Sequence, residues 1–127
     1  MLGSSRQYWV AVVDDDPGFA MSTAALLNSD GFDTRLFDCA ESFIAARDTP
    51  PFCCIMVDWV LPGMNGPTLC ERLAAQESHP PLILMSGTMF NEHDLEQRSP
   101  LGIEFLRKPF DPEGLLAQLS SLCGRSA

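Results

Sequence analysis

Residues 52–58 read FCCIMVD, an unbroken apolar run that stops at an aspartate. A short apolar run of this kind is typical of a strand buried on both faces, so we expect a strand of a parallel sheet over residues 52–57. Four further runs of strand character occur along the chain, at residues 9–13, 32–37, 82–85 and 103–106. The run at 32–37 is more polar and alternates, which predicts a strand at an edge of the sheet.

Segments of helical character separate these runs. Pro17 suits a first helical position and Gly31 a position past the last turn, so we expect a helix over residues 18–30. A second helix is expected over residues 40–47 behind a cap at Asp38. A third is expected to open at Pro67.

The two remaining helices differ in the strength of their pattern. The sequence over residues 111–113, DPE, is a strong helix start, with a cap, a proline and an early acid. The apolar stripe that follows it is Leu115, Leu116, Leu119 and Leu122, and Gly124 ends the helix. Residues 89–100 are mostly polar, with Leu95 nearly alone as an apolar residue, so we expect a short or mobile fourth helix there.

Five strands that alternate with five helical segments predict a single α/β domain, a doubly wound five-stranded parallel sheet flanked by five helices. The length of 127 residues suits one domain with a core of its own. We expect an N-terminal tail over residues 1–8, the domain over 9–123, and a C-terminal tail or the start of a removed linker over 124–127.

The composition excludes several classes of function. Eight basic residues face 17 acidic ones, and the net charge of −9 would repel a phosphate backbone, so the domain alone should not bind nucleic acid. No apolar run approaches the roughly 20 residues that a membrane span needs. The first seven residues lack the apolar stretch of a secretory signal.

The chain contains five cysteines, Cys39, Cys53, Cys54, Cys70 and Cys123. Their odd number, the absence of a Cys-x-x-Cys motif and the adjacent pair inside an apolar run favour neither a disulfide framework nor a zinc site. We therefore expect free thiols that pack as small core residues in a reducing compartment, which makes the chain cytoplasmic.

Polar residues follow four of the five runs. They are Asp14, Asp15 and Asp16 after the first, Asp58 after the third, Ser86 after the fourth and Lys108 after the fifth. Because ligands of parallel α/β sheets gather at the carboxyl ends of the strands, we expect these side chains at one rim. Asp16 directly precedes Pro17 and is expected to cap the following helix.

Clustered carboxylates raise the cost of one another's ionisation, and a hard divalent cation with oxygen ligands relieves it. A metal, a lysine and a hydroxyl can together cancel the charge of transferring phosphoryl oxygens. A carboxylate that faces such a site can act as the acceptor. The strand ends therefore predict a site for phosphoryl chemistry.

Four segments of the chain resemble the bacterial two-component response-regulator receiver family, the CheY-like superfamily. They read VVDDDP at residues 12–17, MVDWVLPGMNG at 56–66, LMSGT at 84–88 and EFLRKPF at 104–110. The resemblance spans residues 9–122 and implies the flavodoxin-like, receiver-type form of the fold.

The resemblance implies that Asp58 accepts a phosphoryl group from a sensor histidine kinase or a histidine phosphotransfer protein. It implies a site for Mg2+, with Mn2+ as the alternative metal. The implied metal ligands are Asp15, Asp58 and the main-chain carbonyl of Val60, with Asp14 acting through water.

The resemblance also assigns roles around the phosphoryl group. Ser86 and Lys108 would hold it, and Phe105 would be the aromatic switch residue. Val60 and Thr88 would tune the lifetime of the phosphate. The Lys108–Pro109 bond would be a cis peptide.

The implied protein is a signalling switch that catalyses its own phosphorylation and dephosphorylation, and is otherwise no enzyme. Its expected partners are the phosphodonor protein and an output domain or effector protein, with no membrane. We expect a monomer or a weak phosphorylation-dependent dimer. The polar segment at 89–100 and Leu101, at a position where many relatives have glycine, put the family's usual dimer surface in doubt.

Two alternatives belong to other classes. A phosphatase of the haloacid dehalogenase type would use Asp14, Asp16, Ser86 and Lys108. Against it, Pro17-Gly18 replaces its usual residues, no later acidic metal motif follows, and Asp58 is left without a role. A degenerate receiver that acts as a constitutive binding module is the other alternative, and the intact set of acids, hydroxyl and lysine argues against it.

Overall fold

The computed structural model describes residues 7–46, 50–88 and 90–125. Strands and helices alternate along the chain. The strands are β1 (Trp9–Val13), β2 (Asp33–Phe37), β3 (Cys54–Asp58), β4 (Leu82–Ser86) and β5 (Ile103–Arg107). The helices are α1 (Pro17–Ser29), α2 (Ala40–Ala46), α3 (Gly66–Ala74), α4 (Glu92–Arg98), the 3-10 turn η1 (Ser99–Leu101) and α5 (Pro112–Leu122).

The five strands form one parallel sheet in the order β2-β1-β3-β4-β5. This confirms the doubly wound prediction, and β2 occupies an edge as its polar pattern predicted. The three inner strands are almost completely buried, whereas β5, at the other edge, exposes part of its side chains. The third strand begins two residues later than expected and includes Asp58 as its last residue.

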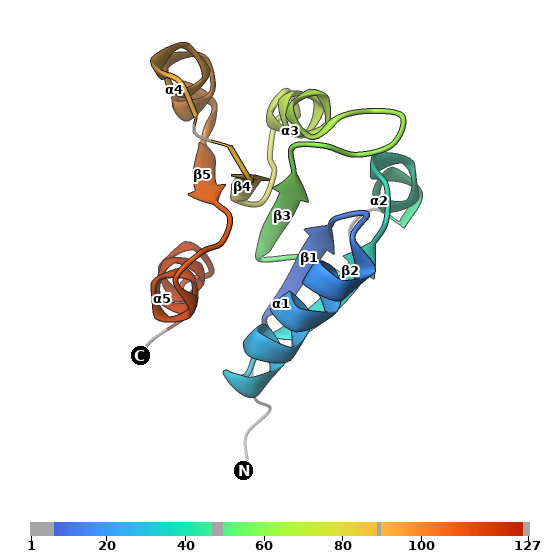
Figure 1. Ribbon diagram of the computed structural model, residues 1–127, viewed down its shortest axis with the longest axis vertical. Coiled ribbons are helices and arrows are strands. Elements are labelled where there is room, and N and C mark those ends of the chain that lie inside the picture. The colour runs from blue at the N-terminus through green and yellow to red at the C-terminus, as the bar shows by residue number, and fades with distance from the viewer. Residues whose placement is uncertain (1–6, 47–49, 89, 126–127) are drawn as a thin grey trace.

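Helices cover both faces of the sheet. Figure 1 shows α1 and α5 along one face and α2, α3 and α4 along the other. Alternate residues of the inner strands feed the two cores: Val10, Cys54 and Met56 pack with α1 and α5, while Ala11 and Ile55 pack with α2 and α3. The sheet therefore divides the interior into two apolar layers.

Side-chain caps start most of the helices. Asp16 accepts hydrogen bonds from the main-chain N–H groups of Gly18 and Phe19, and Asp111 accepts one from Gly114, which confirms both predicted caps. Helix α2 begins at Ala40, so Cys39 rather than Asp38 directly precedes it; Arg47, its predicted last residue, lies outside the described residues.

Helix α4 is as short as its sequence predicted. None of its seven residues, all of which the structure describes, is buried. Asn91 caps its first turn through a hydrogen bond from the N–H of Asp94. Helix α4 is therefore held by few contacts, whereas α5 buries Leu115 and Leu119.

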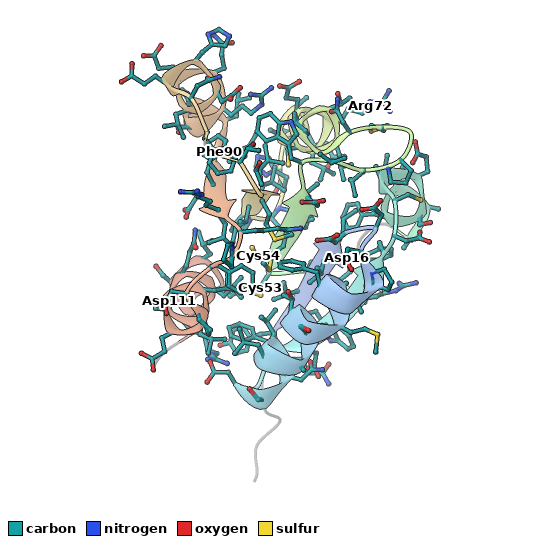
Figure 2. All side chains as sticks on the ribbon, in the orientation of Figure 1. Asp16, Cys53, Cys54, Arg72, Phe90 and Asp111 are labelled. Atoms are coloured by element: carbon teal, nitrogen blue, oxygen red, sulfur yellow. A yellow bond between two sulfur atoms is a disulfide. The ribbon has the colours of Figure 1, made fainter. Side chains whose placement is uncertain are left out.

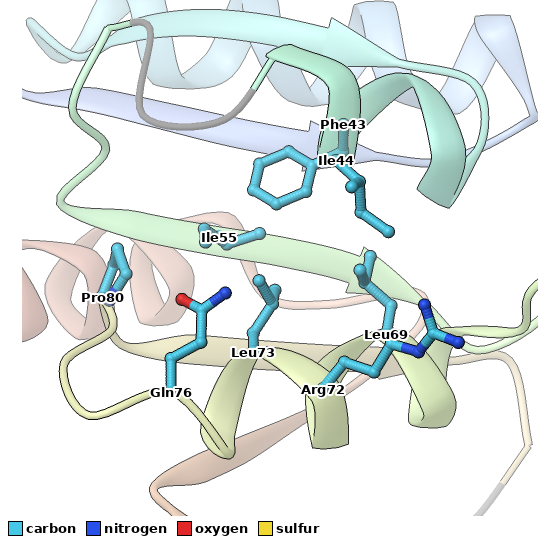
Figure 3. A pocket seen from close by; sticks show the side chains of 8 residues that line it. All are labelled: Phe43, Ile44, Ile55, Leu69, Arg72, Leu73, Gln76 and Pro80. Carbon is cyan, nitrogen blue, oxygen red and sulfur yellow. The ribbon is translucent and has the colours of Figure 1, made fainter.

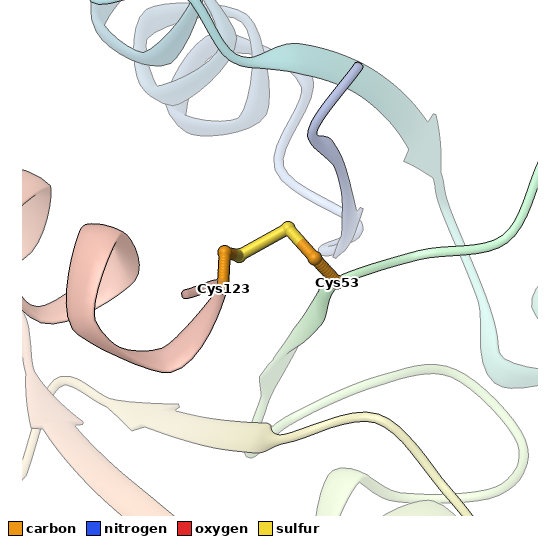
Figure 4. The surroundings of a disulfide bond; sticks show 2 residues. All are labelled: Cys53 and Cys123. Carbon is orange, nitrogen blue, oxygen red and sulfur yellow. A yellow bond between two sulfur atoms is a disulfide. The ribbon is translucent and has the colours of Figure 1, made fainter. Parts of the chain in front are cut away.

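The expectation of five free thiols was wrong for one pair. A disulfide bond joins Cys53, just before β3, to Cys123, just after α5, with the two Cα atoms 5.0 Å apart (Figure 4). The sequence does not reveal this pair because 70 residues separate its members, and only the packing of α5 against the sheet brings them together. Cys54 and Cys70 are buried as expected.

Within the described part of the chain, no helix has the length and apolar character needed to cross a membrane.

Candidate functional site

Three carboxylates meet at the carboxyl ends of β1 and β3. Asp14 and Asp15 follow β1 directly, and Asp58 ends β3. One oxygen from each residue lies within 4.8 Å of the others. Asp14 and Asp58 are buried, with 3% and 9% of their surface exposed, whereas Asp15 is exposed. Because β1 and β3 are parallel neighbours, their register sets this arrangement.

Both carboxylate oxygens of Asp14 have donors. Its Oδ1 accepts a hydrogen bond of 2.9 Å from the N–H of Asp16, and its Oδ2 accepts one of 2.8 Å from Nζ of Lys108. Its own N–H donates to the carbonyl of Phe37 at the end of β2. Asp14 is therefore a fixed acceptor in the floor of the site.

Lys108 lies between two of the carboxylates. Its Nζ is 2.8 Å from Oδ2 of Asp14, 3.0 Å from Oδ1 of Asp58, and 3.9 Å from the centre of the Phe19 ring. Its N–H donates to the Ser86 carbonyl at 2.7 Å, which ties the turn after β5 to the end of β4. The Lys108–Pro109 peptide bond is cis.

The electrostatic environment opposes a charge on Asp58 and favours one on Lys108. Burial raises the pKa of Asp58 above its ordinary value, and the neighbouring charges of Asp14 and Asp15 add to this against the opposing hydrogen bond from Lys108. Burial alone would lower the pKa of Lys108, but its hydrogen bonds to Asp14 and Asp58 outweigh burial and raise it. One ammonium thus faces three carboxylates, and the site keeps an excess of negative charge.

The ends of β3 and β4 carry the other expected site residues. The Ser86 side chain is buried, its Oγ lies 3.0 Å from Oγ1 of Thr88, and it accepts a hydrogen bond of 3.1 Å from the Thr88 N–H. The hydroxyl is thus engaged in a local turn at the rim. The side chains of Val60 and Thr88 are exposed at the same end of the sheet.

Phe105 belongs to an aromatic cluster rather than to the carboxylate group. Its ring centre is 4.7 Å from that of Phe90, which is in turn 5.8 Å from that of Trp59. The Arg98 guanidinium lies 5.4 Å from the Trp59 ring centre. Figure 2 labels Phe90 on the side of the molecule where α3 and α4 lie. These contacts connect the residue after Asp58 to α4.

Neither Phe90 nor Arg98 was identified from the sequence. Both lie in the segment whose sparse apolar pattern predicted only a short helix, and nothing in that pattern indicates a partner for either. An aromatic residue directly before the Asn91 cap was the one available signal, since a residue at that position often packs against its own helix. Here Phe90 packs against Trp59 and Phe105 instead.

Two hollows among the described residues differ in their relation to the carboxylates. An open groove of about 550 Å³ runs from Asp14 and Asp15 past Met21 and Leu36 to Asp38. A separate apolar pocket of about 200 Å³ lies between α2 and α3, as Figure 3 shows, with Ile44, Leu69 and Leu73 among its lining residues. A ligand of the carboxylates would therefore approach through the open groove and not through the apolar pocket.

The donor set of the rim fits a hard divalent cation. Three carboxylates supply oxygen ligands, which Mg2+ and Mn2+ prefer. The exposed Asp15 and the partly accessible Asp58 leave one side of the cluster open to solvent. An open, oxygen-lined site of this kind suits a magnesium ion that keeps several of its waters.

This fold and rim define a class of doubly wound α/β domain with an acidic site at the carboxyl ends of its strands. The sequence profile of the response regulator receiver domain family matches residues 10–120. The chain belongs to this family, whose members act in signalling as switches. The match rules out the phosphatase alternative, in which Asp58 had no role.

Individual relatives agree with the family match. The chain is 35% identical over 112 residues to the transcriptional regulatory protein FixJ of Bradyrhizobium diazoefficiens, covering 88% of this chain and 55% of the relative. It is 32% identical over 118 residues to the DNA-binding response regulator MtrA of Mycolicibacterium smegmatis, covering 92% and 51%. The chain thus spans about half the length of these curated relatives.

Solved structures agree in fold. A response regulator receiver protein from Burkholderia phymatum superposes with a TM-score of 0.78 at 26% identity, covering 95% of this chain and 98% of that one. The receiver domain of the Francisella response regulator 1452 gives a TM-score of 0.84 at 24% identity, covering 93% and 98%. At that lower identity the likeness shows the fold alone.

Proposed function

We propose that this domain accepts a phosphoryl group on Asp58 from a phosphohistidine of a sensor kinase or a phosphotransfer protein. The observation that carries the proposal is the position of Lys108, whose ammonium bridges Asp14 and Asp58 while Asp15 remains exposed beside them. A carboxylate with a cation already beside it, on the open side of an acidic cluster, suits a phosphoryl acceptor.

The metal proposed for this site is Mg2+, with Mn2+ as the alternative. Asp15, Asp58 and the main-chain carbonyl of Val60 would hold it directly, and Asp14 through water. When bound, the metal would supply positive charge to the oxygens of the transferring phosphoryl group. The remaining chemistry is assigned to residues of this chain.

In the proposed reaction, a carboxylate oxygen of Asp58 attacks phosphorus as the bond from phosphorus to the histidine nitrogen breaks. Lys108 pairs with the phosphoryl oxygens through the ammonium that now lies 3.0 Å from Oδ1 of Asp58. The Ser86 hydroxyl exchanges its contact with Thr88 for a hydrogen bond donated to a phosphoryl oxygen.

The switching step is proposed to follow from the movement of Ser86. Phe105 would turn inward and change its contact with Phe90, which would alter the surface that α4 presents. Val60 and Thr88, both exposed beside the site, would set how readily water reaches the acyl phosphate. The energy gap between the two states must be a few kcal/mol for one phosphate to reverse it.

We further propose that the output passes through another domain or an effector protein. Two curated relatives are named as a transcriptional regulator and a DNA-binding regulator, and the chain spans about half of each. The net charge of −9 disfavours DNA binding by this domain itself. The proposed compartment is the cytoplasm, and the proposed state is a monomer or a weak phosphorylation-dependent dimer.

The test is intact-protein mass after incubation with acetyl phosphate, with and without Mg2+. The wild type should gain one phosphoryl group only with the metal, and Asp58→Asn should gain none. Asp38→Asn is the matched control, because Asp38 is an exposed acid that lines the same groove outside the three-carboxylate cluster. A stable label on Asp58→Asn would contradict the assignment of the acceptor.

A second variant separates acceptance from switching. Lys108→Ala should accept phosphate slowly but fail to show the change in Trp59 fluorescence that accompanies phosphorylation of the wild type. A normal fluorescence response in this variant would remove the role proposed for Lys108. If the wild type neither gains phosphate nor responds to Mg2+, the domain is a degenerate receiver that acts as a constitutive binding module.

A further inference from the structure

The Cys53–Cys123 bond lies at the end of the sheet away from the carboxylate rim. Cys53 stands before the first residue of β3, whereas Asp58 is the last residue of that strand. Cys123 follows the last turn of α5. Both residues are half-buried and pack against the edge of the core, so each keeps part of its surface in contact with solvent. Figure 4 shows the bond crossing from the end of α5 to the chain just before β3.

Other interactions hold the two cysteines close together. The N–H of Cys53 donates to the Trp9 carbonyl at 2.8 Å, which fixes it against β1, and the N–H of Cys123 donates to the Leu119 carbonyl at 2.8 Å. Beyond Cys123, the guanidinium of Arg125 pairs with Asp30 and lies 4.0 Å from the centre of the Phe32 ring. The end of α5 is thus held in place without the sulfur–sulfur bond, so two thiols at these positions would stay adjacent.

The three remaining cysteines do not compete for this pair. Cys54 and Cys70 are buried; burial raises the pKa of the Cys54 thiol far above its ordinary value and that of Cys70 to about 12, which keeps both protonated and unreactive. Cys39 is half-buried, with its Sγ 3.1 Å from the Ser42 hydroxyl, and it directly precedes α2, a helix on the opposite face of the sheet from α5. Among the described cysteines, an intramolecular bond is therefore confined to Cys53 and Cys123.

We propose that Cys53 and Cys123 form a reversible redox site, a dithiol that low-molecular-weight disulfides such as glutathione disulfide oxidise. One thiolate attacks glutathione disulfide, forms a mixed disulfide and releases one glutathione. The second thiolate then attacks the protein sulfur of the mixed disulfide and releases the second glutathione. The protein dithiol loses two electrons, and the two glutathione molecules keep those electrons and the two protons.

This site is independent of phosphorylation. Its residues lie at the far end of β3 from Asp58, and none of them contacts the carboxylate cluster within the described chain. In the cytoplasm, the compartment proposed above, disulfides are mostly transient and redox-sensing, which is the behaviour that a half-buried, preassembled pair fits. Oxidation would fasten the end of α5 to the start of β3, and reduction would leave this end held by the buried Leu119 and the Arg125–Asp30 pair.

The test is a redox titration of the wild-type chain in buffers with varied ratios of reduced to oxidised glutathione. The samples are quenched with acid, unfolded, and alkylated with a maleimide, and the labels are counted by intact mass. The count should fall from five, the number of cysteines, to three, the number of free cysteines in the disulfide-bonded form, and should return to five with excess reduced glutathione.

Two variants and a second readout complete the test. Cys39→Ser removes the most accessible cysteine outside the pair, so both counts should fall by one while the titration midpoint stays the same. In Cys123→Ser, the number of maleimide labels should no longer fall by two on oxidation. In the wild type, oxidation should slow amide exchange over residues 119–125 about tenfold, since it adds a covalent tether.

Two results would overturn the proposal. One is a wild-type pair that stays reduced, or that links separate chains, in glutathione disulfide. The other is a bond that excess reduced glutathione fails to open in the folded protein, which would make it a permanent structural disulfide. Acetyl phosphate labelling of Asp58 should be equal in both redox forms. The maleimide count requires no phosphate, so failure of the phosphoryl proposal would leave the redox titration unaffected.

Discussion

At the scale of single residues, Lys108 offsets the electrostatic repulsion between neighbouring carboxylates. Asp14 and Asp58 are buried close together, and the charge of Asp14 helps to raise the pKa of Asp58, which burial raises most. The ammonium contacts both and also lies over the Phe19 ring, which favours a cation. Asp15 has no share in this bridge, so the cluster as a whole still carries more negative than positive charge.

Asp58→Asn should therefore stabilise the metal-free protein. The pKa of Asp58 is raised in the folded state, so this group favours folding most at pH values below its unfolded pKa, and that contribution is lost as the pH rises through its folded pKa. At pH 7 the uncharged amide of the Asp58→Asn variant avoids the destabilisation that the ionised carboxylate causes. The free energy of unfolding in urea with EDTA should rise by no more than about 1 kcal/mol, because water screens the open rim.

The same experiment has two internal checks. The advantage of Asp58→Asn should shrink as the pH falls through the folded pKa of Asp58, and saturating Mg2+ should reverse it, because the wild type then gains a ligand that the amide lacks. Asp38→Asn, outside the cluster, should stay within about 0.5 kcal/mol of wild type. A destabilised Asp58→Asn at pH 7 in EDTA would mean that the Lys108 contact outweighs the repulsion.

At the scale of elements, α4 is attached to the domain through a few side chains. Arg98 pairs with Asp94 one turn earlier and with Glu71 of α3, each at 3.1 Å, and its guanidinium faces the Trp59 ring. None of the described α4 residues is buried, so the Arg98–Glu71 pair is a direct link between α4 and α3 at the surface. The helix can thus respond to small changes beside Trp59.

Arg98→Ala should loosen α4 and leave the rest of the fold intact. Loss of the ion pair with Glu71 and of the ring contact should cost about 1 kcal/mol of unfolding free energy. Amide exchange over residues 92–98 should quicken, and the Trp59 emission should change. Gln97→Ala, an exposed position on the same helix, is the control and should do neither. Unchanged exchange in Arg98→Ala would show that Phe90 alone holds the helix.

The start of α3 packs against the end of β3 so closely that only glycine fits. A Cβ added at Gly66 would overlap the main-chain carbonyl of Asp58 and meet the Cα of Trp59. Gly66→Ala should therefore cost about 1–3 kcal/mol in chemical denaturation and should lower the yield of phosphorylated Asp58, since the strand end must shift. Gly87→Ala meets nothing within 4 Å and should leave stability nearly unchanged, so equal losses in both variants would refute the explanation.

The sequence alone predicted the strands and helix starts that depend on neighbouring residues. Unbroken apolar runs located the inner strands, and Asp16 and Asp111 marked the starts of α1 and α5 because caps act on the next few residues. The strand order and the rim followed from general rules of parallel sheets. The boundaries of β3 were displaced because Phe52 and Cys53 are apolar yet lie before its first paired residue.

The part that could not be predicted depends on contacts between distant segments. The strand ends predicted that Asp14, Asp58 and Lys108 would lie at one rim. They did not predict that the Lys108 ammonium would bridge the two carboxylates. Phe90 and Arg98 gain their partners only when α4 lies beside α3 and β5. The disulfide depends in the same way on the position at which α5 ends.

At the scale of the whole molecule, the disulfide constrains the chain more than any single contact does. It closes a loop over a sequence separation of 70 residues, which removes conformational freedom from the unfolded chain. Reduction of the wild type should therefore lower the unfolding free energy by about 2–4 kcal/mol. The measurement is urea unfolding with and without a reductant, with reduced Cys123→Ser matching the reduced wild type. An equal unfolding free energy with and without the reductant would show that the loop does not restrict the unfolded chain enough to stabilise the fold.

The same bond turns part of the chain into a covalent ring. The ring runs from Cys53 to Cys123 and contains Asp58 and Lys108, while Asp14 and Asp15 lie on the linear segment before it. A protease that cuts once inside the ring leaves a nicked chain that migrates as one species on a denaturing gel until a reductant opens it. A cut before Cys53 releases the acidic pair at once, so the order in which fragments separate identifies the half of the molecule that opened first.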